Sequence, residues 1–231
     1  MDQLTGKAVE DLVRRLGADA ERLIASLTGS TSDPWASFQQ PGDIVLTRGR
    51  RPLSHLNAVL QSILEGRFAK ATHAMMVAAP GLYVDASMRF GVSLLPAQLF
   101  CMDGLAERLG QADGSATRPM WRRRLVAAFR HPDLASVPGR QQALLQAIAG
   151  QLGQPYNRRF IFKRVRAGEA DCSAFCSELV ARTMAQLGLT IVPERRHAAV
   201  LPHTLLRHLS QQGWVDVSND YRSGLPRAFA A

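Results

Sequence analysis

A mostly apolar run at residues 71–79, followed by Pro80-Gly81 and a second apolar run at residues 82–86, most constrains how this chain can fold. Adjacent proline and glycine mark a tight turn. Two short apolar runs joined by such a turn predict a β-hairpin, and so two antiparallel neighbours in a sheet. Similar runs predict further strands at residues 44–47, 91–94, 120–127 and 214–217. A Gly-rich stretch at residues 101–119 predicts an irregular excursion around this sheet.

Other segments place apolar residues at steps of three and four, which is typical of amphipathic helices. They are residues 4–27, 55–65, 141–152, a segment capped by Asp171 or Ser173 and running to 188, and 202–208. In the second of these, the spacing predicts that one apolar face is buried: Leu56, Val59, Leu60, Ile63 and Leu64. Helices combined with a small antiparallel sheet predict an α+β fold.

The chain has 231 residues, of which 46% are hydrophobic, and this suits one globular domain with a sizeable core. The turn formers at residues 29–34 predict the end of the first helix and a linker. We therefore expect an N-terminal amphipathic helix and linker at 1–34 and one domain at 35–231. The apolar stripe of that first helix predicts packing on the domain or self-association, because its polar face carries acids that disfavour membrane docking.

The charge is strongly positive, with 28 Lys and Arg against 19 Asp and Glu and a net charge of +9. Such a surface attracts polyanions such as anionic membrane lipid, cell-wall polymer or nucleic acid, although an evenly spread charge only confers solubility. The start of the chain lacks the basic and apolar regions of a secretory signal, and no apolar run is long enough to span a membrane. These features predict synthesis in the cytoplasm, with any export by a specialised secretion system.

Three cysteines, Cys101, Cys172 and Cys176, form an odd set that argues against a disulfide framework. No second Cys or His pair stands at zinc-site spacing from Cys172 and Cys176, so we expect no metal and no cofactor. Cys176 falls in the first turn of its predicted helix, where N–H groups and the helix dipole lower the pKa of a thiol. His73 interrupts an apolar strand and requires a polar partner. A cysteine and a histidine in such positions indicate a nucleophile and its base.

The order of these signals resembles the circularly permuted branch of the NlpC-type papain-like proteins, which includes YiiX-like hydrolases and relatives of lecithin:retinol acyltransferase. The matching pieces, in chain order, are Pro41-Gly42-Asp43-Ile44-Val45-Leu46, Thr72-His73-Ala74, Tyr83-Val84-Asp85-Ala86, Gly91-Val92, Gly153 to Tyr156, Phe175-Cys176-Ser177-Glu178-Leu179-Val180 and Leu201-Pro202. The resemblance covers residues 41 to about 217 and implies a permuted papain-like fold. Its most specific piece is the Cys-Ser-Glu-Leu-Val helix start.

The resemblance implies that Cys176 is the nucleophile, His73 the general base and Asp85 the acid that orients the imidazole. Tyr156 matches a tyrosine able to hydrogen-bond an oxyanion. Cys172 is the rival nucleophile, but only Cys176 is followed by the family's pattern. Glu178 is expected to be a helix-surface or structural acid rather than a catalytic one. The chain departs from the family at Thr72, Met75 and Asn157, where a serine, a glycine and an aspartate are common.

The hairpin register does not by itself select Asp85. A turn centred on Pro80-Gly81 places residue 85 opposite residue 76 and one diagonal step from residue 74, so that His73 is not its direct neighbour. A β-bulge near the turn would shift this pairing. The sequence therefore leaves the third catalytic residue to the resemblance.

Three functions follow as expectations. The first is a cysteine hydrolase or acyltransferase, an amidase or esterase that acts through an acyl-enzyme on an acyl lipid or a cell-wall peptide, of the kind that a bacterial effector carries. The second is an inactive lipid- or peptide-binding module of the same fold. The third, nucleic-acid binding through basic residues such as Arg122-Arg123-Arg124 and Arg158-Arg159, lacks a recognition motif and is disfavoured. The oligomeric state stays open.

Overall fold

The computed structural model describes residues 38–49, 52–88, 90–96, 100–102, 121–137, 139–156, 175–193 and 200–223. The expected N-terminal helix at 4–27, the boundary at residue 34 and Cys172 lie outside these residues. Of the helices within the described ranges, none has the length and apolar character needed to cross a bilayer.

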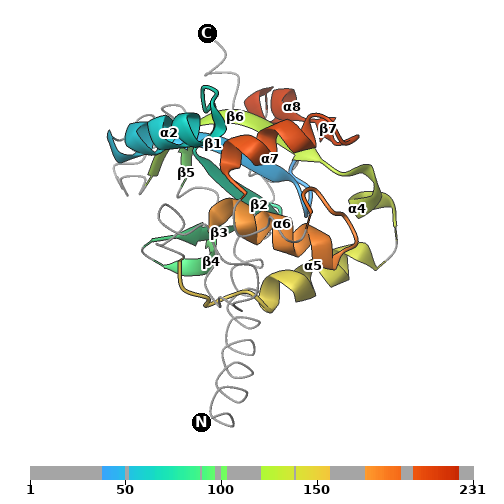
Figure 1. The fold of residues 1–231 in the computed structure, drawn as a ribbon. Coiled ribbons are helices and arrows are strands. Elements are labelled where there is room, and N and C mark those ends of the chain that lie inside the picture. The colour runs from blue at the N-terminus through green and yellow to red at the C-terminus, as the bar shows by residue number, and fades with distance from the viewer. Residues whose placement is uncertain are drawn as a thin grey trace.

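A seven-stranded sheet forms the centre of the described part of the chain (Figure 1). Its strands are β1 (Ile44–Gly49), β2 (His73–Ala79), β3 (Leu82–Ser87), β4 (Gly91–Pro96), β5 (Phe100–Met102), β6 (Trp121–Arg130) and β7 (Val215–Asp216). The order is β4-β3-β2-β1-β6-β5, with β7 paired to β6. All neighbours are antiparallel except β5 and β6, which are parallel. The predicted hairpin of residues 71–86 is confirmed as β2 and β3.

The helices are α2 (Pro52–Glu65), α4 (Pro132–Ser136), α5 (Arg140–Ala149), α6 (Cys176–Gln186), α7 (Pro202–Leu209) and α8 (Ser218–Ser223). The sequence did not predict the two shortest, α4 and α8, which are too short to show a helical period. Strands and helices together confirm the α+β class. Helix α6 begins at Cys176, later than the predicted caps, which lie outside the described residues.

Alternating side chains divide the core between the two faces of the sheet, as the twofold period of a strand requires. On one face, Ala74 and Met76 of β2 pack with apolar residues of α5, α6 and α7. On the other face, Met75 and Val77 pack with Val217 beside α8 and with other apolar residues. Helix α6 therefore lies against the first face of the sheet, with its N-terminus directed at the hairpin.

The prediction of a buried apolar face on residues 55–65 is wrong. Four large apolar side chains of α2 are exposed by more than half: Leu56, Val59, Ile63 and Leu64. The inner face carries instead Asn57, Ala58 and Gln61, and Gln61 is fully buried. The Asn57 amide donates to the Thr72 carbonyl at 3.3 Å and the Gln61 amide to the Asn57 side chain at 3.1 Å. The hydrogen bond from Asn57 to residue 72, directly before β2, and the burial of Gln61 therefore fix the polar side of this helix toward the sheet.

Candidate active site

The N-terminus of α6 is held from several directions, and this fixes Cys176 as its first residue. The Glu178 carboxylate accepts a hydrogen bond from the Phe175 N–H at 3.1 Å and lies 2.5 Å from Arg182. The Ser177 hydroxyl donates to the Val200 carbonyl at 2.6 Å. A carboxylate that binds a free N–H group of a first turn stabilises the helix start. Glu178 is thus a structural acid, and it is buried rather than at the surface.

His73 and Asp85 come from neighbouring strands and are in contact, with 2.5 Å between His73 Nε2 and Asp85 Oδ1. The register explains the contact. Met76 faces Val84, whereas a turn centred on Pro80-Gly81 would place it opposite residue 85. A register shift between Val77 and Ala79 accounts for this difference of one residue. The next step of this ladder places Asp85 beside residue 75, so Asp85 and His73 share a face as diagonal neighbours.

The Cys176 sulfur lies beside the opening between β2 and β3. The pairing of β2 with β3 begins at Met76 and Val84, whereas Ala74 pairs with Leu46 of β1. N–H groups of a strand point along the plane of the sheet, and the Ala74 N–H interacts with the sulfur. The sulfur therefore meets β2 one residue from His73. In the described residues no hydrogen bond joins the thiol to the imidazole, and catalytic hydrogen bonds commonly shorten only with substrate bound.

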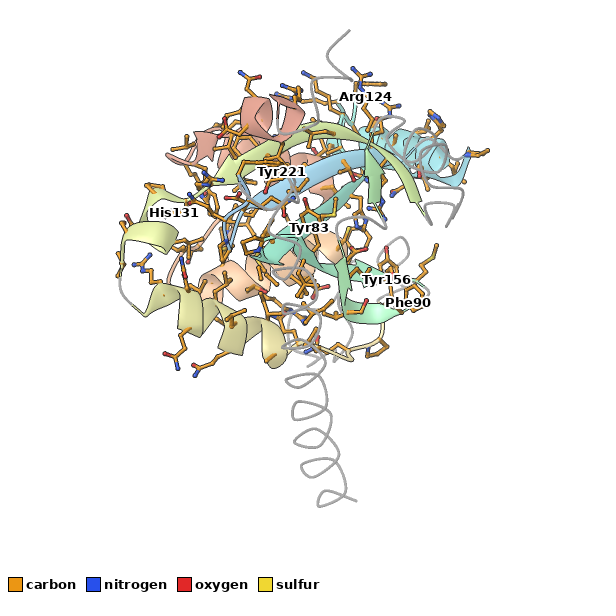
Figure 2. All side chains as sticks on the ribbon, turned by 180° about the vertical axis from the view of Figure 1, so that it is seen from behind. Tyr83, Phe90, Arg124, His131, Tyr156 and Tyr221 are labelled. Carbon is orange, nitrogen blue, oxygen red and sulfur yellow. The ribbon has the colours of Figure 1, made fainter. Side chains whose placement is uncertain are left out.

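Tyr156 lies near Phe90 in Figure 2 and is close enough to Cys176 and Asp85 for their charges to act on its hydroxyl. The segment before it is hydrogen-bonded to β4. The Val92 N–H donates to the Gln154 carbonyl at 2.9 Å, and the Gly153 N–H donates to the Val92 carbonyl at 2.9 Å. Gly91 allows this approach, because a Cβ atom there would lie 2.3 Å from the Gln154 oxygen. The Tyr156 ring packs edge-on against Phe175, with 5.7 Å between centroids.

Arg123 is a further member of the site, although its place in the charge run Arg122-Arg123-Arg124 predicted a basic surface residue. Its side chain is 10% exposed, and its guanidinium lies 4.0 Å from Asp85 Oδ2. Its charge also influences the Cys176 thiol and the Tyr156 hydroxyl. The neighbouring Arg124 is exposed and projects at the rim of the molecule (Figure 2). The twofold period of a strand could have predicted the burial of Arg123, because Arg123 and the buried Leu125 are two residues apart and so point to the same face of β6.

The electrostatics favour an ionised Asp85 beside a neutral His73. Burial opposes the charge of Asp85, but the contact with His73 and the nearby Arg123 lower its pKa overall. Burial and the charge of Arg123 lower the pKa of His73 below 6.5, against the opposite effect of Asp85. A neutral imidazole next to a carboxylate donates its Nε2–H to that carboxylate. The Nδ1 atom of His73 is then left as an acceptor.

Burial raises the pKa of the Cys176 thiol to about 12, although N–H groups of Ala74 and Ser177 and the charge of Arg123 act in the opposite direction. The expectation that the helix start would depress this pKa is therefore wrong for the resting site, because desolvation outweighs the N–H groups. The thiolate must form through proton transfer to a base. Burial also raises the pKa of Tyr156, which keeps its hydroxyl protonated as a donor.

Within the described ranges, no three His, Cys, Asp or Glu side chains gather into a group able to hold a metal ion. Comparison with protein-family models and with curated proteins finds no match. The site is therefore interpreted from its own geometry: a thiol at a helix start, an imidazole at a strand start, a buried carboxylate, a buried guanidinium and a tyrosine hydroxyl.

The raised thiol pKa leads to a prediction for alkylation. The rate constant of Cys176 with iodoacetamide should keep rising above about pH 8.5, where an ordinary thiol begins to level off. His73→Asn should slow the reaction near neutral pH by removing the proton acceptor. Peptide mass spectrometry would separate Cys176 from the other cysteines. A rate that is already constant below pH 8 would show a resting thiolate and contradict the predicted protonation state.

Proposed function

We propose that the chain is a cysteine hydrolase or acyltransferase of the permuted papain-like type, acting on an acyl lipid or a cell-wall peptide. The observation that carries the proposal is the contact of 2.5 Å between His73 and Asp85, one residue from the backbone N–H that faces the Cys176 sulfur. The order of elements, with the histidine strand before the cysteine helix, supports the permuted arrangement.

In the proposed reaction, His73 Nδ1 takes the proton of the thiol as the Cys176 sulfur attacks the substrate carbonyl. The carbonyl oxygen becomes an oxyanion, to which Tyr156 and N–H groups at the start of α6 can donate. The protonated imidazole then gives its proton to the leaving amine or alcohol as the bond to it breaks, which leaves a thioester on Cys176. Water or another acceptor, deprotonated by His73, releases the acyl group and restores the thiol.

Asp85 and Arg123 act through His73 in this proposal. The Asp85 carboxylate fixes which ring nitrogen carries the proton and stabilises the imidazolium that forms, as in other catalytic triads. Arg123 favours the ionised form of Asp85 and disfavours a protonated His73 at rest. The buried cation therefore preserves the neutral base on which proton transfer depends.

The test compares cells that produce the protein with cells that produce Cys176→Ala, followed by mass spectrometry of lipids and cell-wall fragments. We expect a class of lipid or peptide to be depleted, with its hydrolysed or transferred product accumulating, only with the unaltered protein. The purified variant must keep its circular dichroism and melting temperature. Identical profiles, together with retained ligand binding by the variant, would overturn the enzymatic proposal in favour of a binding module.

A further inference from the structure

Helix α2 carries its apolar residues on the outside, which is the reverse of an ordinary amphipathic helix in a globular domain. The exposed side chains, together with Phe68 after the helix, form what we name the α2 apolar face: Leu56 56%, Val59 54%, Ile63 71%, Leu64 63% and Phe68 67% exposed. Scattered exposed leucines are ordinary, but a contiguous group of large apolar side chains marks an interaction surface. The buried Gln61 on the inner face shows that this orientation is built into the fold.

Cations flank the α2 apolar face. The Arg48 guanidinium lies over the Phe68 ring, 5.1 Å from its centroid. Arg67, Lys70 and Arg207 are exposed and close enough to one another to act together on His203. The acid of α2, Glu65, is half-buried and accepts a hydrogen bond from the Thr204 hydroxyl. Exposed apolar residues with a basic border match the interface of an anionic bilayer, where tails meet negative headgroups.

Helix α2 adjoins the candidate active site through the side opposite its apolar face. The inner side of α2 binds the strand ends through Asn57, whose amide donates to the Thr72 carbonyl, and Thr72 directly precedes His73. The Gly49 N–H donates to the Thr72 hydroxyl at 3.2 Å, which ties β1 to the same point. A bilayer in contact with the apolar face would therefore lie one helix diameter, roughly 10 Å, from the end of β2 that carries the proposed base.

We infer that the α2 apolar face docks the protein on anionic membranes and presents the site to lipids held in the bilayer. The bilayer, rather than a protein, is the occupant that the basic border favours, given the net charge of +9. The statement that the membrane delivers substrate to Cys176 rests on the proposed function. Membrane binding itself does not require turnover, so it can be measured with the Cys176→Ala chain.

The test is co-sedimentation of the full-length Cys176→Ala protein with vesicles of phosphatidylcholine, with and without phosphatidylglycerol as a third of the lipid. We expect binding to the anionic vesicles that weakens as salt is raised. Adding Ile63→Glu should lower the partition coefficient about tenfold or more, since an apolar anchor is replaced by a charge of the repelled sign. Its melting temperature should not change, because Ile63 is 71% exposed.

The matched control is Leu145→Glu, which makes the same kind of change at a leucine 48% exposed on α5, far from α2 in Figure 1. It should bind vesicles like the parent chain.

Equal binding by the Ile63→Glu variant and the parent chain would overturn the inference. So would a dimer that Ile63→Glu dissociates, which would identify a second copy as the occupant, or a fall in melting temperature without a change in binding, which would identify another segment of this chain. Absence of anionic-vesicle binding by the Cys176→Ala chain, together with turnover of a soluble ester by the unaltered protein, would refute docking alone and leave the proposed chemistry standing.

Discussion

Asp43→Ala is expected to lower the free energy of unfolding by about 3–5 kcal/mol, because it removes one partner of a buried charge pair. The Asp43 side chain is fully buried and accepts two hydrogen bonds of 2.7 Å from Arg130. The Tyr221 hydroxyl donates to it at 2.9 Å and the Gln40 N–H at 3.0 Å. The substitution leaves these donors without their acceptor. Since the Arg130 side chain is 19% exposed, water can reach it, and this places the effect near the lower limit.

Thermal and urea unfolding followed by circular dichroism would measure this loss, which corresponds to roughly 6–12 °C in melting temperature for about 3 kcal/mol at this chain length. Asp133→Ala is the control, since the Asp133 carboxylate is 50% exposed and lies 3.6 Å from Arg140. It should change stability by less than about 1 kcal/mol. Similar losses for both variants would show that the buried network around Asp43 contributes no more than a surface pair.

Much of the sheet follows from local sequence signals. Pro80-Gly81 and the apolar runs on either side specify the hairpin, because a tight turn leaves adjacent strands little choice of partner. The one-residue register shift between Val77 and Ala79 could not be inferred, since no residue type there demands a bulge. That shift places Asp85 on the face of His73. The family resemblance predicted the contact between His73 and Asp85. Its physical cause, the register shift, is seen only in the folded structure.

Helix α2 shows a different limit of sequence interpretation. A helical period states that one face is apolar but not that the same chain covers it. The orientation depends on the hydrogen bond from Asn57 to residue 72 and on the burial of Gln61, which are contacts between segments. If the α2 apolar face docks on a bilayer, the helical period identified the apolar residues of this helix correctly. Only the expectation that the domain itself buries them was wrong.

Arg123 shows how a charge run can conceal an inward-facing residue. Three consecutive arginines suggest a solvated basic strip, yet a strand directs alternate side chains to opposite faces. Arg123 faces Asp85, and Arg124 is exposed. A buried cation is stable only with a partner, and that partner comes from β3, about forty residues earlier in the chain. Only a tertiary structure brings the two together.

Asp85→Ala is expected to reduce the hydrolysis of an activated ester, such as p-nitrophenyl butyrate, by about 10²–10⁴-fold, the range that general-base catalysis and triad orientation supply. Without the carboxylate, nothing fixes the Nε2–H of His73 or stabilises the imidazolium. Cys176→Ala should lose more, because it removes the nucleophile. Asp133→Ala, at a half-exposed carboxylate, should keep full activity.

Asp85→Asn separates the charge of the side chain from its size. An amide can donate its NH2 to an unprotonated Nε2 as well as accept from Nε2–H, and it cannot stabilise an imidazolium, so this variant should lose about as much activity as Asp85→Ala while keeping the size of the side chain. The pH profile provides the second readout. His73 must be neutral to act as a base, so activity falls as the pH drops through its pKa, which burial places below 6.5. Because Asp85 raises the pKa of His73, removing its charge lowers that pKa further, and the acid limb should move to lower pH in both variants. A merely structural Asp85 would change the amount of active protein without moving that limb, and full activity in Asp85→Ala would assign the third position of the triad to another group.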